Sequence, residues 1–165
     1  MTHFPISLLF AAALSMASCA PGGNQKISNW NHADQKPGGA CTAPAAPEGT
    51  VIGTTTDLAG QRLLGNWRDG AWAKPNGMLT GYCSNIAVVS LDALAGTARI
   101  YFGSSSRDEA AVVTVKYMDG TISHATPSVQ YAMRVDAAGY LRVEFTEPDG
   151  TFYATLRRVA AARKD

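Results

Sequence analysis

After Gly49, the chain is organised as short runs of β-branched and aromatic residues separated by turn residues. The runs recur about every 8 to 12 residues, a spacing typical of an all-β sandwich or barrel. The expected strands are residues 51–56, 62–67, 86–91, 97–102, 111–118, 121–124, 129–135, 140–146 and 152–158. The sequence therefore predicts an all-β fold, a small antiparallel up-and-down barrel or sandwich of about eight or nine strands.

Late in the chain, apolar and polar residues alternate within three of these runs. Successive side chains of a strand point to opposite faces of the sheet, so every second residue shares a face. The apolar faces consist of Val113, Val115 and Tyr117, of Val129, Tyr131, Met133 and Val135, and of Leu141, Val143 and Phe145. Asp-Gly pairs at 119–120 and 149–150 are typical of tight hairpin turns. We therefore expect a meander of hairpins with one face in the core and the other in water.

The apolar N-terminal segment ends at Cys19, directly after Met16, Ala17 and Ser18. Its length matches the apolar core of a secretory signal and falls short of the roughly 20 residues that cross a bilayer. With small residues before the cysteine, the segment resembles a bacterial lipoprotein signal. The resemblance implies a signal peptide over 1–18, acyl chains on Cys19 that anchor the protein to a membrane, and a place in the cell envelope, on the outer membrane facing the periplasm. The alternatives are an ordinary secretory signal, in which Cys19 is incidental, and a retained core helix.

The region that follows is rich in Pro, Gly, Asn, Gln and Ala, which predicts a flexible tether over 19–49. As a free coil, the part from Cys19 to Cys41 would span about 25 Å. We expect the β domain to occupy 50–161 and a short tail to occupy 162–165. The size of the remaining chain favours a single domain.

The chain has three cysteines. Acylation of Cys19, as the lipoprotein resemblance implies, would leave Cys41 and Cys83 as a pair in an oxidising compartment, which predicts a disulfide between them. The alternative is two reduced, separately buried cysteines. Because no C-x-x-C spacing is present and the histidines follow no ligand-like pattern, we expect no metal site and no other cofactor.

Charge argues against a nucleic-acid partner. The chain carries 14 basic and 13 acidic residues, so its net charge is +1. Such a balance creates no extended positive field that would attract a phosphate backbone.

Gly65, Asn66 and Trp67 form a G-x-W motif near the start of the β region, and Arg157 and Arg158 lie on the last expected strand. Together with the meander, these residues resemble the arrangement in lipocalin and avidin-like barrels. The resemblance implies that Trp67 plugs one end of the barrel and that Arg157 or Arg158 packs across its indole through a cation–π contact. The alternative is another small barrel or sandwich with a tryptophan in its core.

Trp72 and Tyr82 lie in a Gly-rich stretch between expected strands. One interpretation is an aromatic platform for a sugar ring or an apolar ligand. The simpler one is a long hairpin that turns at 74–77 and whose aromatic side chains cover the barrel mouth.

Little in the chain indicates catalysis. His124 ends a short strand, and the serines that might accompany it, Ser123 and the flexible loop at 104–106, lie in no recognisable nucleophile motif. The acidic residues mostly occupy turns or exposed strand positions, where they predict no catalytic pair. We therefore expect no catalytic residues and a protein that is not an enzyme.

The leading functional hypothesis is a non-enzymatic envelope lipoprotein whose β domain binds a small ligand or an envelope protein. The main alternative is a periplasmic protease inhibitor of small-barrel type, with residues 28–46 as an inhibitory arm. Acylation of Cys19 would fix the start of that arm and argues against its free insertion into a protease. The third hypothesis is an envelope hydrolase.

Overall fold

The computed structural model describes residues 41 to 160. The predicted signal peptide, Cys19, the tether up to residue 40 and the tail at 162–165 therefore lie outside the described residues. Within the described part, no helix is both long and apolar enough to cross a membrane.

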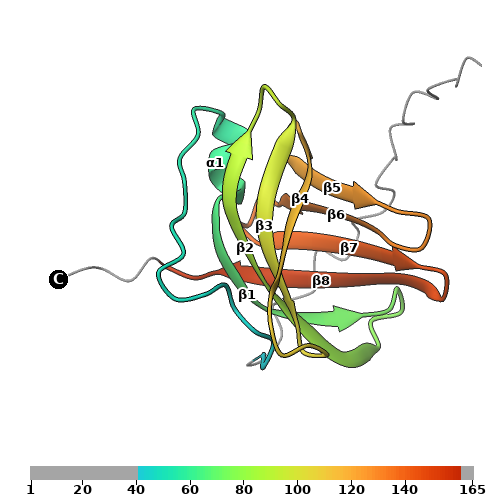
Figure 1. Ribbon diagram of the computed structural model, residues 1–165. Coiled ribbons are helices and arrows are strands. Elements are labelled where there is room, and N and C mark those ends of the chain that lie inside the picture. The colour runs from blue at the N-terminus through green and yellow to red at the C-terminus, as the bar shows by residue number, and fades with distance from the viewer. Residues whose placement is uncertain (1–40, 161–165) are drawn as a thin grey trace, which may run out of the picture. The chain divides into compact units, whose positions relative to one another are not determined.

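The described chain forms one short helix and a closed antiparallel barrel (Figure 1). Its elements are α1 (Leu58–Leu63), β1 (Gly65–Ala73), β2 (Leu79–Asp92), β3 (Thr97–Ser104), β4 (Ala111–Met118), β5 (Thr121–Ala125), β6 (Gln130–Val135), β7 (Leu141–Glu147) and β8 (Gly150–Arg158). Each strand pairs with the next along the chain, and β8 pairs with β1 to close the sheet. The all-β prediction is confirmed, and of the two architectures left open the barrel is the one observed.

Apolar side chains from every strand fill much of the barrel interior. The largest of those that are fully buried are Trp67, Ile86, Ile100, Ile122, Met133, Leu141 and Leu156. The alternation predicted for the late strands places Val115 and Tyr117 of β4 and Val143 of β7 in this core. Burial of this apolar surface is the main source of stability in a fold of this kind.

The segment before β1 departs from the prediction. Residues 51–56, expected to be a strand, are irregular, and the expected strand at 62–67 instead begins within α1. The reason is a helix cap: the Asp57 carboxylate accepts hydrogen bonds from the backbone N–H groups of Ala59 and Gly60 at 3.2 and 3.0 Å. Such a cap satisfies donors that a helix start leaves without a partner and so favours a helix here. The Tyr117 hydroxyl also donates to Asp57, which lowers the pKa of that carboxyl and holds α1 against β4.

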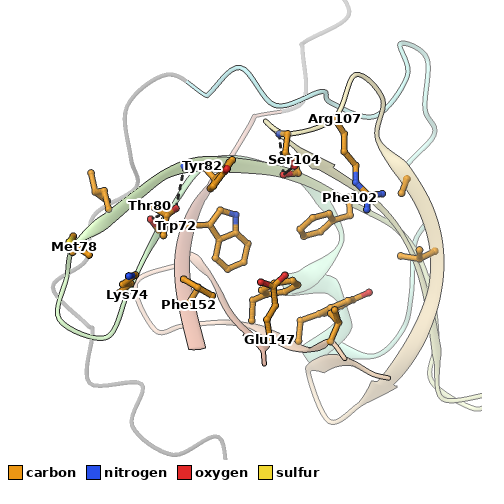
Figure 2. Close-up of a pocket in the computed structure, with 17 residues that line it drawn as sticks. Trp72, Lys74, Met78, Thr80, Tyr82, Phe102, Ser104, Arg107, Glu147 and Phe152 are labelled. Atoms are coloured by element: carbon orange, nitrogen blue, oxygen red, sulfur yellow. Dashed lines mark hydrogen bonds between the residues drawn. The ribbon is translucent and has the colours of Figure 1, made fainter. Parts of the chain in front are cut away.

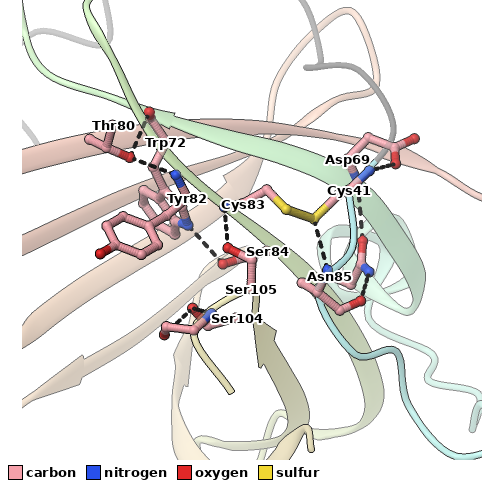
Figure 3. The surroundings of a disulfide bond; sticks show 12 residues. Cys41, Asp69, Trp72, Thr80, Tyr82, Cys83, Ser84, Asn85, Ser104 and Ser105 are labelled. Atoms are coloured by element: carbon pink, nitrogen blue, oxygen red, sulfur yellow. Dashed lines mark hydrogen bonds between the residues drawn. A yellow bond between two sulfur atoms is a disulfide. The ribbon is translucent and has the colours of Figure 1, made fainter. Parts of the chain in front are cut away.

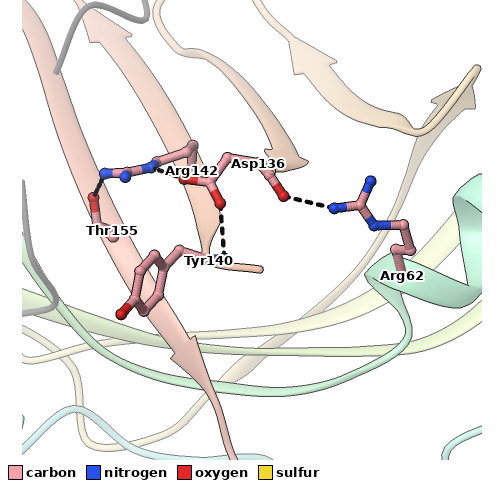
Figure 4. Close-up of polar contacts among 5 residues, drawn as sticks. All are labelled: Arg62, Asp136, Tyr140, Arg142 and Thr155. Atoms are coloured by element: carbon pink, nitrogen blue, oxygen red, sulfur yellow. Dashed lines mark hydrogen bonds and ion pairs between the residues drawn. The ribbon is translucent and has the colours of Figure 1, made fainter. Parts of the chain in front are cut away.

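Polar contacts fix the other side of α1 to the turn between β6 and β7 (Figure 4). Arg62 donates to the backbone carbonyl of Asp136 at 2.6 Å, and the Asp136 carboxylate pairs with Arg142 at 2.7 Å. Burial opposes the charge of Asp136, but the hydrogen bonds from Arg142 and the backbone of Tyr140 outweigh it and hold the pKa of this carboxyl below its usual value. The helix is therefore tied to two separate parts of the barrel.

The segment from Cys41 to Pro44 packs against β2 and β3, and Figure 3 shows the surroundings of its disulfide. Cys41 forms the predicted disulfide with Cys83 of β2, with 5.8 Å between their Cα atoms. The Asn85 side-chain amide donates to the Ala43 carbonyl at 2.6 Å. A Cβ atom added at Gly103 would lie only 1.8 Å from the carbonyl oxygen of Pro44, so the absence of a side chain there lets the segment approach β3 closely.

Candidate functional site

One end of the barrel is closed by Trp67. Its side chain is fully buried, and its indole N–H donates to the carbonyl of Leu63 in α1 at 2.8 Å. The Arg158 guanidinium carbon lies 4.5 Å from the centre of the Trp67 rings, and the same guanidinium donates to the carbonyls of Arg62 and Leu64. Of the two arginines considered from the sequence, Arg158 is therefore the one that packs across the indole.

Arg157 has a different position. It pairs with the carboxylate of Asp69 on β1, which also accepts a hydrogen bond from the backbone N–H of Cys41 at 3.3 Å. Asp69 lies at an irregularity in the β1–β2 pairing and has a φ of 63°. Arg157 thus helps to attach the disulfide-bonded segment to β1 rather than cover Trp67.

The opposite end of the barrel contains a cavity of about 780 Å³ (Figure 2). Apolar and aromatic side chains form much of its lining: Trp72, Met78, Leu79, Phe102, Val113, Tyr131, Phe145 and Phe152. Three charged residues also border it, namely Lys74, Arg107 and Glu147. The cavity is therefore an aromatic pocket with a few charged groups.

Trp72 is fixed in the wall of this cavity. Its indole N–H donates to the hydroxyl of the fully buried Ser84 at 2.7 Å, and its ring centre lies 5.5 Å from that of Phe145. Because a buried indole N–H without a partner would be costly, the Ser84 contact holds the ring in one orientation. The cavity wall is thus preformed on this side.

A second aromatic group lines another part of the wall. The rings of Phe102 and Tyr131 stack with 6.3 Å between their centres, and the centre of the His124 ring lies 5.2 Å from that of Tyr131. Burial raises the pKa of Tyr131 to about 12, so its phenol is neutral at physiological pH. His124 packs on an aromatic ring, and among the described residues no hydrogen bond joins it to a serine.

Tyr82 belongs to the rim. It is 57% exposed and lies on β2 near Met78 and Leu79, which are also exposed. The β1–β2 hairpin turns at 74–77 as expected, with the N–H of Gly77 donating to the carbonyl of Lys74 at 2.9 Å. Trp72 and Tyr82 therefore border the same cavity, one as part of its wall and the other at its edge.

Most of the cavity lining is not predicted from the sequence. Four aromatic residues of the expected strands occupy the end of the barrel opposite Trp67: Phe102, Tyr131, Phe145 and Phe152. A concentration of aromatic residues at strand ends that meet in an up-and-down meander is the signal that would have indicated it. Among the described residues, no group of three His, Cys, Asp or Glu side chains is arranged to hold a metal ion.

Comparison of the chain with family models, with curated proteins and with solved structures finds no significant match in any of the three.

Proposed function

We propose that this protein is a non-enzymatic, lipid-anchored envelope protein whose barrel binds a small apolar or amphipathic ligand in the cavity opposite Trp67. The observation that carries the proposal is the cavity of about 780 Å³ with its aromatic lining. An eight-stranded barrel is just wide enough for its own side chains to fill it or for one small ligand to bind. The volume lies within the range of about 300–1,000 Å³ that is usual for small-molecule sites.

The closed end supports a lipocalin-like interpretation of the barrel. Trp67 and Arg158 seal that end together with α1, so a ligand would enter and leave at the other one. The fixed position of Trp72 favours binding, because a wall that is already ordered loses little conformational entropy when a ligand arrives.

Binding by the cavity can be tested with N-phenyl-1-naphthylamine, an uncharged aromatic probe whose fluorescence rises in apolar surroundings. We expect saturable binding of one probe molecule per chain. Val113→Phe should weaken binding at least about tenfold, because Val113 lines the cavity and the larger ring would occupy it. The measurement is a fluorescence titration.

Val112→Phe is the matched control, since Val112 is the preceding residue of β4, is exposed, and does not line the cavity. It should bind the probe like the unaltered protein. Circular dichroism would establish that both variants are folded. Absence of saturable binding, or equal loss in the two variants, would refute a ligand-binding cavity.

The lipid anchor forms a separate part of the proposal. Cys83, which holds Cys41, is adjacent to Tyr82 on the cavity rim. The chain from the acylated Cys19 would therefore join the barrel at Cys41, beside the open end. Such an attachment would keep the cavity within reach of a membrane.

Cys19→Ser should abolish acylation and move the protein from the membrane to the soluble fraction. The Cys41–Cys83 disulfide and the barrel should be retained, because neither depends on Cys19. Metabolic labelling with a fatty acid and membrane fractionation measure the two effects. Continued tight association of the variant with membranes would contradict the lipoprotein assignment.

A further inference from the structure

One side of the cavity mouth carries a small polar cluster, here called the polar edge, made of Ser104, Ser106 and Arg107. All three residues line the cavity. Figure 2 shows Ser104 and Arg107 on the same side of the cavity as Phe102. The hydroxyl oxygens of Ser104 and Ser106 are 2.9 Å apart. Two hydroxyl groups and a guanidinium thus border the cavity within the short segment 104–107.

Hydrogen bonds to β2 hold the polar edge in position. The N–H of Ser105 donates to the Cys83 carbonyl at 2.9 Å, and the N–H of Cys83 donates to the Ser105 hydroxyl at 3.0 Å. The N–H of Arg107 donates to the carbonyl of Ser104 at 2.9 Å. Cys83 also forms the disulfide with Cys41. The segment 104–107 is therefore attached to β2 at its disulfide-bonded residue.

Arg107 carries a positive charge at the mouth. Arg142 pairs with Asp136 and Arg157 with Asp69, whereas no ion pair of Arg107 is found within residues 41–160. A guanidinium presents planar, forked donors that fit the oxygens of a carboxylate, sulfonate or phosphate. Nearby serine hydroxyls supply further donors to the same type of group.

Glu147 lies on a different strand of the mouth, at the end of β7. Its negative charge would repel an anion placed beside it. An anionic group on a bound ligand is therefore favoured at the polar edge and disfavoured near β7. Lys74, in the turn between β1 and β2, is the other cation that borders the cavity, so two cations and one carboxylate give the mouth a preference for anions.

We infer that the ligand is an anionic amphiphile, whose apolar body occupies the aromatic cavity and whose carboxylate or phosphate binds Arg107, Ser104 and Ser106. This inference rests on the proposed ligand-binding function and specifies its chemical class. The polar edge binds the charged group, and the aromatic wall binds the rest of the molecule.

Two probes with the same ring system test the charge preference: 1-anilinonaphthalene-8-sulfonate, which is anionic, and N-phenyl-1-naphthylamine, which lacks the sulfonate. Arg107→Gln should weaken binding of the sulfonate about fivefold, as expected for loss of an exposed charge contact. It should leave the affinity for the neutral probe unchanged. Added salt should weaken the binding of the sulfonate probe alone, because dissolved ions screen the charge of Arg107.

Arg99→Gln is the matched control, because Arg99 is an exposed residue of β3 that does not line the cavity. It removes the same charge and should change neither affinity. If neither probe binds the unaltered protein, the proposed function itself fails. If the neutral probe binds and Arg107→Gln affects the sulfonate no more than Arg99→Gln does, only the inference about the anion is overturned.

Three competitors with the same alkyl chain length but different head groups distinguish a carboxylate ligand from a phosphate ligand. Each is tested for displacement of N-phenyl-1-naphthylamine. Dodecanoate and dodecyl phosphate, used below their micelle concentrations, should displace the probe more strongly than 1-dodecanol. Arg107→Gln should remove that advantage. A stronger effect of the carboxylate would indicate a fatty acid, and a stronger effect of the phosphate a phospholipid product. Equal displacement by the alcohol would overturn the inference.

Discussion

Replacing Cys41 and Cys83 together by serine is expected to lower the free energy of unfolding of the barrel by about 4 kcal/mol. The bond joins residues 42 positions apart and so restricts a long stretch of the unfolded chain, in which the entropic effect of a cross-link is large. The folded state should survive the change, because the cysteines lie on the outer side of the barrel and the core does not depend on them. Urea denaturation followed by circular dichroism measures the difference.

The control is reduction of the unaltered protein. Dithiothreitol should lower its stability to that of the double variant and should leave the double variant unchanged. The polar contacts of Asp69 and Asn85 with residues 41 to 43 remain in both, so these contacts do not account for the difference. A loss below about 1 kcal/mol would contradict the entropic explanation.

The late strands of the barrel were predictable because apolar and polar residues alternate along them, and this alternation distinguishes the core face from the outer face. In β4, Val115 and Tyr117 alternate with polar residues, and in β7, Leu141 and Val143 do the same. The Asp-Gly sequence at 119–120 specified the turn that pairs β4 with β5. Local pattern and tertiary structure agree at these apolar positions. Arg142, between Leu141 and Val143, departs from the pattern, because it is also buried and pairs with Asp136.

The first half was harder to predict for two physical reasons. Residues 51–56 contain β-branched side chains, but Asp57 caps α1 immediately afterwards and the segment has no strand partner in the sheet. In β1 and β2, irregular pairing between Trp67 and Gly70 interrupts the alternation of inward and outward residues. The conformation of Asp69 at that irregularity is set by contacts with Cys41 and Arg157, which are distant in sequence.

The candidate site could be predicted only in part. Trp72 and Tyr82 were identified by their Gly-rich surroundings, and both border the cavity. The cavity itself depends on how far the side chains of Phe102, Phe145 and Phe152 fill the space inside a closed sheet. Aromatic residues at several strand ends indicate where such a space could lie, but its volume depends on packing in three dimensions.

Trp67→Ala is the second change for which a large effect is expected, with a loss of about 4 kcal/mol in the free energy of unfolding. Trp67 is fully buried, and its removal would leave a void between α1 and the barrel core. The loss should appear as a lower urea midpoint. Trp67→Phe keeps part of the buried area and should lose less, which provides a folded variant if the alanine form is too unstable to study.

A double-mutant cycle separates the contact with Arg158 from this packing effect. Arg158→Gln removes the guanidinium over the indole, and its cost should shrink by about 1 kcal/mol when Trp67 is already alanine. The cost should shrink by less when Trp67 is phenylalanine, because that ring can still face a cation. Arg157→Gln is the matched control, because the neighbouring arginine pairs with Asp69 and should show no such coupling with Trp67. Equal coupling for both arginines would mean that the effect is transmitted through β8 as a whole, and the cation–π contact would then have no specific part in closing this end of the barrel.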